Sequence, residues 1–412
     1  MNQPKPKHIL LVAGESSGDL HASHLVRALN STYPAQYTFS ALGGKHLAAE
    51  NVPPLYDLAR LGVTGLSAVF KQLWPLYHAF KVLKNHLAEQ PPDLLILIDY
   101  PGFNLRLAKY VKKRFNFPIL YYISPQIWAW KANRIHHIRR YVDHMAVILP
   151  FEKPLFEKAQ VPCTFVGHPL VHTLTALPAA SLIKHQIALL PGSRRHEIHY
   201  HMPILIQTVR LLLQKHSYLT FVIPLASTLS AKDFQPYLSK VKLPITLTTT
   251  PAMHIVNQSE AVVVASGTAA LECALLAKPM CIIYKVSLLS AVVVSQVIRV
   301  QYLGLCNLIA KRMIVPELIQ EDCTPEAIAE TLDGFLSNPL AAKALTNRLL
   351  QLKATLSQEH ADKPIHELVH QLCAMGGCIT DAPFPNLAGY RDIEALKSSH
   401  SFCVPTPVAA EI

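Results

Sequence analysis

Short apolar runs alternate along this chain with longer stretches in which apolar and polar residues recur at helical spacing. A run of four or five apolar residues is typical of a parallel strand that is buried on both faces. The stretches between the runs are long enough for the helices that connect parallel strands. Strands are predicted at residues 8–12, 94–98, 119–123, 145–149, 187–190, 219–223, 261–265 and 280–284. The pattern therefore predicts an α/β protein with doubly wound parallel sheets.

The predicted strands fall into two series, and each series opens with an apolar strand, a turn of small residues and a helix. We therefore predict two Rossmann-like domains facing each other across a cleft, at residues 1–168 and 185–340, joined by a hinge at 169–184. Residues 341–375 continue as helices by pattern, whereas 376–412 carry four prolines without periodicity and are expected to form a disordered tail. Ligands of such sheets bind at the carboxyl ends of the strands, so the residues that follow each strand are the candidates for function.

The composition narrows the class of protein. Half of the 412 residues are hydrophobic and 16% are charged, which excludes an intrinsically disordered chain. Subtracting 27 acidic from 38 basic residues gives a net charge of +11, which suits nucleic acid, an anionic membrane or a phosphorylated substrate. We find neither a secretory signal nor an apolar run of the ~20 residues that a transmembrane helix needs. Eight cysteines without a C-x-x-C pair indicate reduced, mostly buried thiols, as expected in the cytoplasm.

The loop after the first predicted strand reads Gly-Glu-Ser-Ser-Gly-Asp, from Gly14 to Asp19. Its glycines would let the backbone approach a ligand closely, and the start of the following helix offers free N–H groups to an anion. The loop is neither a G-x-G-x-x-G fingerprint nor a Walker loop. The residues alone fit equally well a tight turn in which Asp19 caps the helix.

Two loops of the second series follow the same logic. The sequence Pro-Gly-Ser-Arg-Arg at 191–195 lies between a strand and a helix, where backbone N–H groups and the Arg194 guanidinium could hold a diphosphate. The other loop consists of Ser266, Gly267 and Thr268. Glu272 follows one helical turn later and could accept hydrogen bonds from two vicinal hydroxyls. Together the two loops favour a nucleotide as ligand.

Asp99 directly follows the strand at 94–98 and precedes Tyr-Pro-Gly-Phe-Asn. A carboxylate at this position faces the cleft, which suits a general base. On these residues alone, an aspartate that initiates a turn before Pro-Gly is the simpler interpretation.

The sequence gives little support for a metal site. His196, His199 and His201 cluster after the arginine loop, but they have no cysteine partners. The chain contains no Asp-x-Asp that could bridge a metal and a diphosphate. Aromatic residues at 121–130 lie beside basic ones, a pattern that could stack nucleic-acid bases, wall a sugar or lipid pocket, or pack the domain.

Seven motifs follow one another in order between about residues 8 and 373. They are Ala-Gly-Glu-Ser-Ser-Gly-Asp at 13–19, Ile-Asp-Tyr-Pro-Gly-Phe-Asn at 98–104, Ser-Pro-Gln-Ile-Trp-Ala-Trp at 124–130, Leu-Pro-Phe-Glu at 149–152, Leu-Pro-Gly-Ser-Arg at 190–194, Ser-Gly-Thr at 266–268 and Val-Pro-Glu-Leu-Ile at 315–319. Jointly these motifs are highly specific, and through them the chain resembles the lipid-A-disaccharide synthases.

The resemblance implies an inverting GT-B glycosyltransferase, with the acceptor bound by the first Rossmann-like domain and the donor nucleotide by the second. It implies transfer from UDP-2,3-diacylglucosamine to 2,3-diacylglucosamine 1-phosphate (lipid X). The products would be the β(1→6)-linked lipid A disaccharide 1-phosphate and UDP. We expect a single in-line displacement with no covalent intermediate, no cofactor and no metal.

The resemblance also assigns roles to residues, position by position. Asp99 matches the base that would activate the acceptor 6-hydroxyl, and Arg194 matches a diphosphate contact. The other assigned substrate-binding residues are Glu15, Ser17 and Gly18 near the acceptor, and Ser266, Gly267, Thr268, Glu272, Asn307 and Glu317 near the nucleotide. The chain departs from the family at Gly102, where a second aspartate is usual, and at Ser16, where alanine is common.

Because both implied substrates carry acyl chains, we expect a cytoplasmic protein attached peripherally to the inner membrane. Residues 66–86 interleave aromatic and aliphatic side chains with lysines, as an interfacial amphipathic helix does. We predict Phe70, Trp74 and Phe80 as membrane contacts. By pattern alone, a core helix with a solvated lysine edge fits as well. The resemblance also suggests a homodimer.

Two other functions fit parts of the sequence. A UDP-sugar 2-epimerase also binds its substrate between two Rossmann-like domains, but it acts without an acceptor. A nucleic-acid-binding protein is indicated only by the net charge and the aromatic residues, and no known nucleic-acid module is present, so we expect no nucleic-acid partner.

Overall fold

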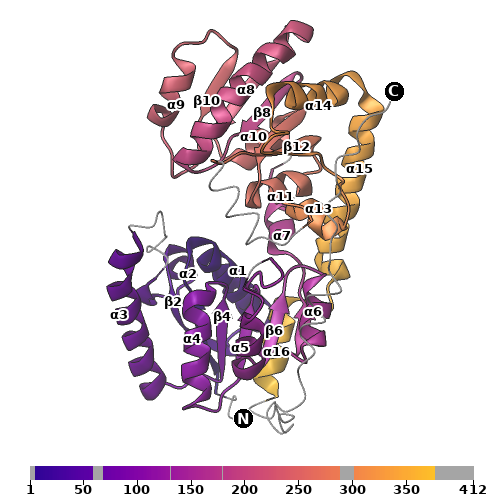
Figure 1. Cartoon of the computed structure of the whole chain (residues 1–412). Helices are drawn as coiled ribbons and strands as arrows, with labels where there is room; N and C mark the ends of the chain where they lie inside the picture. Colours follow the sequence, from indigo (N-terminus) through magenta and orange to yellow (C-terminus); the bar gives the residue numbers. More distant parts are fainter. Residues whose placement is uncertain (1–4, 59–67, 130, 179, 288–300, 376–412) are drawn as a thin grey trace.

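The computed structural model describes residues 5–58, 68–129, 131–178, 180–287 and 301–375. Two parallel sheets form two lobes, and helices cover both faces of each sheet (Figure 1). The predicted tail at 376–412 lies outside the described residues. All eight predicted strands are present to within two residues at each end, which confirms the α/β prediction.

The first sheet has seven strands in the order β3-β2-β1-β4-β5-β6-β7. Their bounds are β1 (Lys7–Ala13), β2 (Tyr37–Gly43), β3 (Pro54–Asp57), β4 (Leu94–Ile98), β5 (Ile119–Tyr122), β6 (His144–Val147) and β7 (Cys163–Phe165). The helices that follow these strands are α1 (Ser16–Thr32), α2 (Lys45–Ala49), α3 (Ala68–Glu89), α4 (Pro101–Lys112), α5 (Arg134–Tyr141), α6 (Glu152–Lys158) and α7 (Pro169–Thr175).

The second sheet has six strands in the order β10-β9-β8-β11-β12-β13. Their bounds are β8 (Gln186–Leu190), β9 (Thr220–Pro224), β10 (Ile245–Thr248), β11 (Ala261–Ala265), β12 (Met280–Tyr284) and β13 (Glu317–Ile319). The helices are α8 (Arg195–Lys215), α9 (Ala231–Leu238), α10 (Ala252–Gln258), α11 (Thr268–Leu275), α13 (Leu305–Ala310), α14 (Pro325–Ser337), α15 (Pro339–Leu356) and α16 (Ile365–Ala374).

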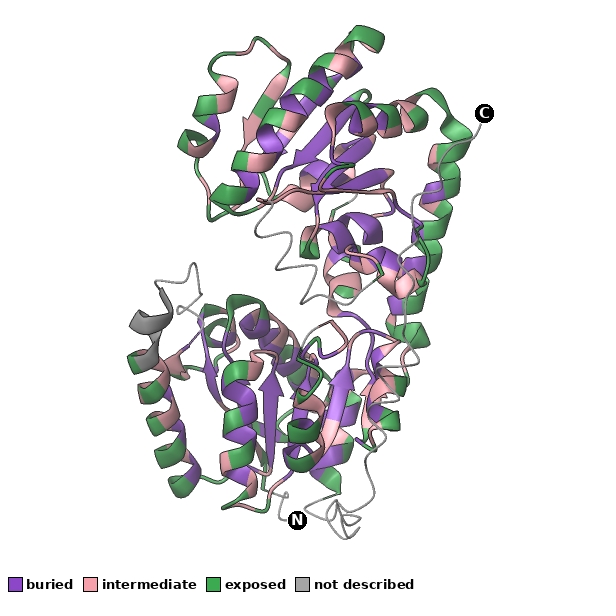
Figure 2. Ribbon diagram, viewed as in Figure 1, coloured by how far each residue is buried: buried purple, intermediate pink, exposed green. Residues whose placement is uncertain are grey.

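The central strands are apolar because they are buried on both faces. In β1, Leu10 and Val12 pack into the cluster beneath α3 and α4, whereas Ile9 and Leu11 pack on the opposite face against α1. Every residue of β4 is buried as well (Figure 2). Neither strand can therefore show a polar alternation, and a continuous apolar run is what the sequence displays.

The last two helices divide between the lobes. The α15 helix packs on the second lobe through Leu345, Leu349 and Leu352. The chain then returns to the first lobe, where the buried side chains of α16, among them Leu368 and Val369, join the core cluster that contains α1 (Figure 1).

The two lobes share an apolar cluster on the side where the chain passes between them. Leu149 contributes from the loop after β6 and Leu174 from α7 in the first crossing. The remaining members are Leu271 and Leu275 of α11 and Leu356 at the end of α15. The two crossings are also hydrogen-bonded, because the His168 N–H donates to the Leu356 carbonyl at 2.8 Å. No helix among the described residues is long and apolar enough to cross a membrane.

Candidate active site

The strand order of each sheet reverses at one point, between β1 and β4 in the first sheet and between β8 and β11 in the second. At such a switch point the loops after the two strands diverge and leave a crevice. The loop at 14–19 and Asp99 follow β1 and β4, and the loops at 191–195 and 266–268 follow β8 and β11. The structure thus places the four predicted loops at the two switch points.

Asp99 is half-buried at the end of β4, and its pKa is raised to about 6. Burial is the main cause, and the nearby Glu15 carboxylate raises the pKa further. A hydrogen bond from the backbone of Tyr100 and the charge of Arg134 oppose this shift. A carboxylate with this pKa is largely ionised at neutral pH, yet it is more basic than an ordinary aspartate, as a general base must be.

The start of α1 presents part of the predicted acceptor loop to solvent. Glu15 occupies the N-cap position without a capping hydrogen bond to its side chain, and Ser17 is exposed in the first turn. Gly18 is buried instead, and a Cβ atom added there would meet Ala13 and Ile98 at 3.6 Å. Gly18 therefore packs α1 on the sheet, while Glu15 and Ser17 are free to face a ligand.

Asp19 serves a neighbouring helix rather than α1. Its carboxylate accepts hydrogen bonds from the backbone N–H groups of Gly44 at 2.7 Å and His46 at 2.9 Å. Both donors lie at the start of α2, so Asp19 caps α2, and the interpretation in which it caps its own helix is wrong.

Two glycines near Asp99 have different surroundings. A Cβ atom on Gly14 would lie 2.0 Å from the ring of Tyr100, so the ring can rest there only because residue 14 is glycine. Gly102, which stands where the family has an aspartate, is exposed, and a Cβ atom there would meet nothing within 4 Å. The missing carboxylate therefore leaves no gap in the packing.

The arginine loop of the second lobe is shaped by Glu197 in the first turn of α8. Its carboxylate accepts from the backbone N–H groups of Ser193 at 2.7 Å and Arg194 at 3.1 Å. Gly192 has φ 123°, and a Cβ atom there would collide with Glu197. Held in this way, the Arg194 side chain remains 69% exposed and can reach a ligand.

His201 holds the arginine loop through the Pro191 carbonyl and has a defined tautomer. Its Nδ1 lies 2.6 Å from the Pro191 carbonyl oxygen, and its Nε2 lies 3.0 Å from the Lys285 backbone nitrogen. The carbonyl can only accept and the N–H can only donate, so Nδ1 carries the proton. Among the described residues, no three His, Cys, Asp or Glu side chains are grouped as metal ligands would be.

The loop after β11 is open to solvent. Gly267 and Thr268 are exposed, and a Cβ atom on Gly267 would meet nothing within 4 Å. The Ser266 hydroxyl donates to the Leu303 carbonyl at 3.3 Å. Glu272 is half-buried one turn into α11, and burial raises its pKa.

Asn307 and Glu317 hold the backbone near this loop. The Asn307 amide donates to Glu317 at 2.7 Å and accepts from the N–H groups of Ile314 and Val315. The Glu317 carboxylate also accepts from the Gly304 N–H at 2.9 Å, at the start of α13. Both predicted nucleotide contacts are therefore engaged inside the protein, where they position residues 303–307.

Glu152 is a buried carboxylate for which no role was predicted from the sequence. It accepts from the Ser124 hydroxyl at 2.6 Å and the Trp128 indole N–H at 3.0 Å. Burial raises the pKa of Glu152 to about 7, although these donors oppose the shift. The residue anchors the loop after β5, and its place in the Leu-Pro-Phe-Glu motif was the only signal in the sequence.

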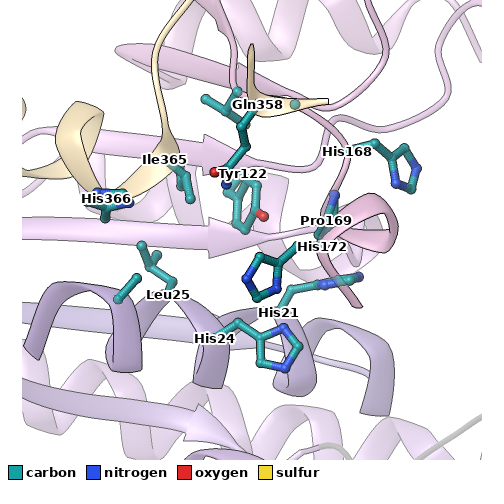
Figure 3. A pocket seen from close by; sticks show the side chains of 13 residues that line it. His21, His24, Leu25, Tyr122, His168, Pro169, His172, Gln358, Ile365 and His366 are labelled. Carbon is teal, nitrogen blue, oxygen red and sulfur yellow. The ribbon is translucent and has the colours of Figure 1, made fainter. Parts of the chain in front are cut away.

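A cavity of about 110 Å³ lies where the chain crosses between the lobes. Figure 3 shows its side chains, which include His21 and His24 of α1 and His168 and His172 of the first crossing. Burial, followed by the neighbouring histidine, lowers the pKa of His21 to about 4 and that of His168 to about 3. The buried imidazoles are therefore neutral near pH 7, and the lining includes neither Asp99 nor Arg194.

The α3 helix combines the two interpretations of its sequence. Ala79, Leu83 and Leu87 are fully buried in the first core, as in an ordinary core helix. Near the other end, Trp74 and Tyr77 are 73% and 70% exposed. Phe80 packs against Phe103 and Tyr110, and Phe70 lies in a stretch whose side chains are not described, so an aromatic contact with lipid would depend on Trp74 and Tyr77.

A model of the lipid-A-disaccharide synthetase family matches residues 9–371. The chain belongs to this family. A lipid-A-disaccharide synthase 1 of Legionella pneumophila (strain Paris) is 47% identical over 375 residues, covering 89% of this chain and 97% of that protein. Membership of the lipid-A-disaccharide synthetase family confirms the prediction of a glycosyltransferase of lipid A synthesis.

Solved structures resemble this member of the family in fold. The glycotransferase of kitacinnamycin has a TM-score of 0.59 at 15% identity and covers 90% of this chain and all of its own. The UDP-GlcNAc 2-epimerase of Neisseria meningitidis, bound to UDP-GlcNAc, has a TM-score of 0.57 at 13% identity. The match covers 88% of this chain and 98% of the epimerase chain. At these identities the likeness concerns the fold alone, and it confirms the two-lobed GT-B architecture.

Proposed function

We propose that this protein transfers 2,3-diacylglucosamine from UDP to the 6-hydroxyl of lipid X, forming the β(1→6)-linked disaccharide 1-phosphate and UDP with inversion. Family membership supports the reaction class. The observation that carries the chemistry is Asp99, an unusually basic carboxylate beside a crevice of the first sheet.

In this mechanism Asp99 takes the proton of the acceptor 6-hydroxyl while that oxygen attacks C1 of the donor sugar. The bond from C1 to the diphosphate breaks, its electron pair leaves with UDP, and the configuration at C1 inverts. A free hydroxyl is a poor nucleophile, and general-base assistance contributes about 10²–10⁴ in rate. The first domain would thus hold the acceptor, and it includes α16 because that helix completes its core.

The second domain would hold the donor. The charge that develops on the leaving diphosphate would be balanced by the exposed Arg194 guanidinium. Ser266, Gly267 and Thr268 would face the same ligand, with Glu272 accepting from the ribose hydroxyls. Asn307 and Glu317 would act by positioning the backbone of residues 303–307.

The reaction is tested by mass spectrometry of the products formed from UDP-2,3-diacylglucosamine and lipid X. We expect the tetraacyl disaccharide 1-phosphate only when both substrates are present. Conversion of a UDP-aminosugar without any acceptor would instead identify a 2-epimerase, the function of the structurally similar Neisseria protein.

The donor site is tested by titrating UDP into the Arg194→Ala and Glu272→Ala variants. Each variant loses a hydrogen bond to a charged group, which costs about 1.5–3 kcal/mol, so we expect weaker binding by tenfold or more. Arg210→Ala is the matched control, because Arg210 is an exposed arginine farther along α8. Unchanged affinity in both variants would remove these residues from the donor site.

Membrane attachment is the third part of the proposal. The acyl substrates require access to lipid at the cytoplasmic face of the inner membrane, and Trp74 and Tyr77 offer aromatic side chains suited to the headgroup region. Nearby lysines would each add about 1 kcal/mol at an anionic surface, so that binding weakens in salt.

This attachment is tested by flotation with anionic liposomes. We expect the Trp74→Ser, Tyr77→Ser double variant to float less than the unaltered protein, with its circular dichroism unchanged. Tyr218→Ser serves as control, since Tyr218 is an exposed aromatic residue of the second lobe. Equal flotation of all three proteins would exclude this end of α3 as the docking surface.

A further inference from the structure

The backbone at the proposed base has an unusual conformation. Asp99 and Tyr100 have φ angles of 46° and 45°, so two consecutive residues other than glycine lie in the left-handed region. L-residues seldom adopt this conformation because Cβ approaches the backbone oxygen, and it persists only where the surrounding contacts enforce it. The contacts that enforce it here are therefore candidates for a functional role.

Two buried polar side chains converge on one atom of this turn. The carbonyl oxygen of Asp99 accepts a hydrogen bond from the Tyr121 hydroxyl at 2.6 Å and another from the Asn104 amide at 2.7 Å. Both side chains are fully buried, Tyr121 in β5 and Asn104 in α4. The Asn104 amide also donates to the Ile98 carbonyl at 3.1 Å, so it binds two successive carbonyl groups at the end of β4.

The hydrogen bonds of the Asn104 amide come with a loss of stability at the other atom of the same amide group. The Asn104 Oδ1 atom is buried and has no hydrogen-bond partner. An unsatisfied buried acceptor destabilises the folded state. The presence of asparagine at 104 is explained by its amide nitrogen, which donates hydrogen bonds to the turn that carries Asp99.

On the other side of the turn, the ring of Tyr100 rests on Gly14, where no side chain could fit. The Asp99–Tyr100 peptide is thus held by hydrogen bonds at its carbonyl and by ring packing at the following residue. Fixing the carbonyl of Asp99 fixes its ψ angle, and this sets the direction of its Cα–Cβ bond and of the carboxylate.

We propose that Tyr121 is a positioning residue for the glycosyl transfer, acting through Asp99. Its hydroxyl and the Asn104 amide hold the Asp99 turn in the left-handed conformation, which aims the carboxylate at the acceptor hydroxyl before substrate arrives. The inference rests on the proposed role of Asp99 as base. A base displaced by about 1 Å can lose about 10²-fold in rate, so one hydroxyl can matter without touching substrate.

The test uses Tyr121→Phe in the full-length protein, since this substitution removes one oxygen and keeps the buried ring. We expect kcat to fall 10- to 100-fold, while the KM for lipid X and the affinity for UDP change less than twofold. The acid limb of the kcat profile should also move to lower pH, because a freed carboxylate becomes better solvated. If the Tyr121 hydroxyl were purely structural, its removal would lower thermal stability and leave the acid limb of the kcat profile at the same pH.

Tyr122→Phe is the matched control. Tyr122 follows Tyr121 in β5 and is similarly buried, but its ring lies in the core on the opposite face of the sheet. Turnover in Tyr121→Phe equal to that in Tyr122→Phe would overturn the proposal. Should Tyr121→Phe fail to fold, Asn104→Ser removes the second donor, and a folded Asn104→Ser variant with unaltered kcat would overturn it equally.

Asp99→Asn, assayed in parallel, separates the two hypotheses. If Asp99→Asn turns over normally, the assignment of the base is wrong and the positioning role falls with it. If Asp99→Asn is inactive and Tyr121→Phe is fully active, only the positioning role is wrong.

Discussion

Asp99 is held in a state that would suit a general base but that makes the folded protein less stable. Burial and the Glu15 carboxylate both disfavour its charged form, and its backbone is left-handed. Each of these features makes the folded state less favourable than it would be with a neutral residue. A residue so placed is expected to increase activity and reduce stability.

The first prediction concerns the stability of Asp99→Asn. The pKa of Asp99 is about 6 when folded and 3.8 ordinarily, so the folded state binds the proton more tightly. Folding is therefore favoured below pH 4, and this contribution is lost as pH rises through 6. At 1.36 kcal/mol per pKa unit, the neutral variant should be more stable at pH 8 by up to about 3 kcal/mol, while turnover falls by about 10²–10⁴.

Urea unfolding at pH 4 and pH 8 measures this difference. The stability gain of Asp99→Asn should be present at pH 8 and should largely vanish at pH 4. A variant that is less stable than the unaltered protein at pH 8 would show that the Asp99 charge is compensated in the fold.

At the scale of the element, the sequence predicted the central strands and missed the edge strands together with β2, an interior strand whose middle residues are partly exposed. Strands such as β4 read as unbroken apolar runs because helices cover both sides. The edge strands β3 and β10 are half-exposed and mix polar with apolar residues, so their sequence does not differ from that of a loop. An apolar run in the sequence reflects burial of the strand, and edge strands are buried too little to show such a run.

The candidate site follows the same division. Asp99 and Arg194 could be found because their position after a strand is a local property of the sequence. The role of Asn307 depends on partners that only the folded chain brings near. Asn307 illustrates the difference, because nothing in the sequence indicated its hydrogen bonds with residues 314–317.

The second prediction concerns Asn307→Ala. The substitution leaves the Ile314 and Val315 N–H groups and the Val315 carbonyl without their buried partner. Since each unsatisfied group costs about 1–3 kcal/mol and water will replace some of them, we expect a net loss of about 2–4 kcal/mol in the free energy of unfolding. UDP binding should weaken too, because the 303–307 segment loses its support.

The matched control is Asn338→Ala, which removes an exposed asparagine that caps α15 at its N-terminus. That change should cost about 1 kcal/mol and leave UDP binding unaltered. Equal losses of stability in the two variants would contradict the structural role given to Asn307.

At the scale of the whole molecule, the first lobe is assembled from both ends of the chain. Residues of α16 such as Leu368 and Val369 occupy the same core cluster as Leu25 and Val26 of α1. The stability of the first lobe therefore depends on a segment that follows the second lobe in sequence.

The third prediction concerns Leu368→Ala, a substitution at a residue that is 3% exposed. Loss of a buried leucine typically costs 2–5 kcal/mol, and here the loss should fall on the first lobe. Hydrogen exchange should show faster opening of β1 and α1, with β8 and β11 protected as before. Leu350→Ala on α15 is the control, because Leu350 is 50% exposed and should cost little.

The return of α16 to α1 also sets the order in which the molecule can be completed during translation. The apolar face of α1 emerges from the ribosome early, but the helix that covers it is made only after the whole second lobe. At ~5–20 residues per second, more than 300 residues separate the two, and the nascent chain carries an uncovered hydrophobic strip for tens of seconds. The second lobe can meanwhile fold as a unit, so this synthase should be most prone to aggregation, and most dependent on chaperones, until α16 has emerged and packed against α1.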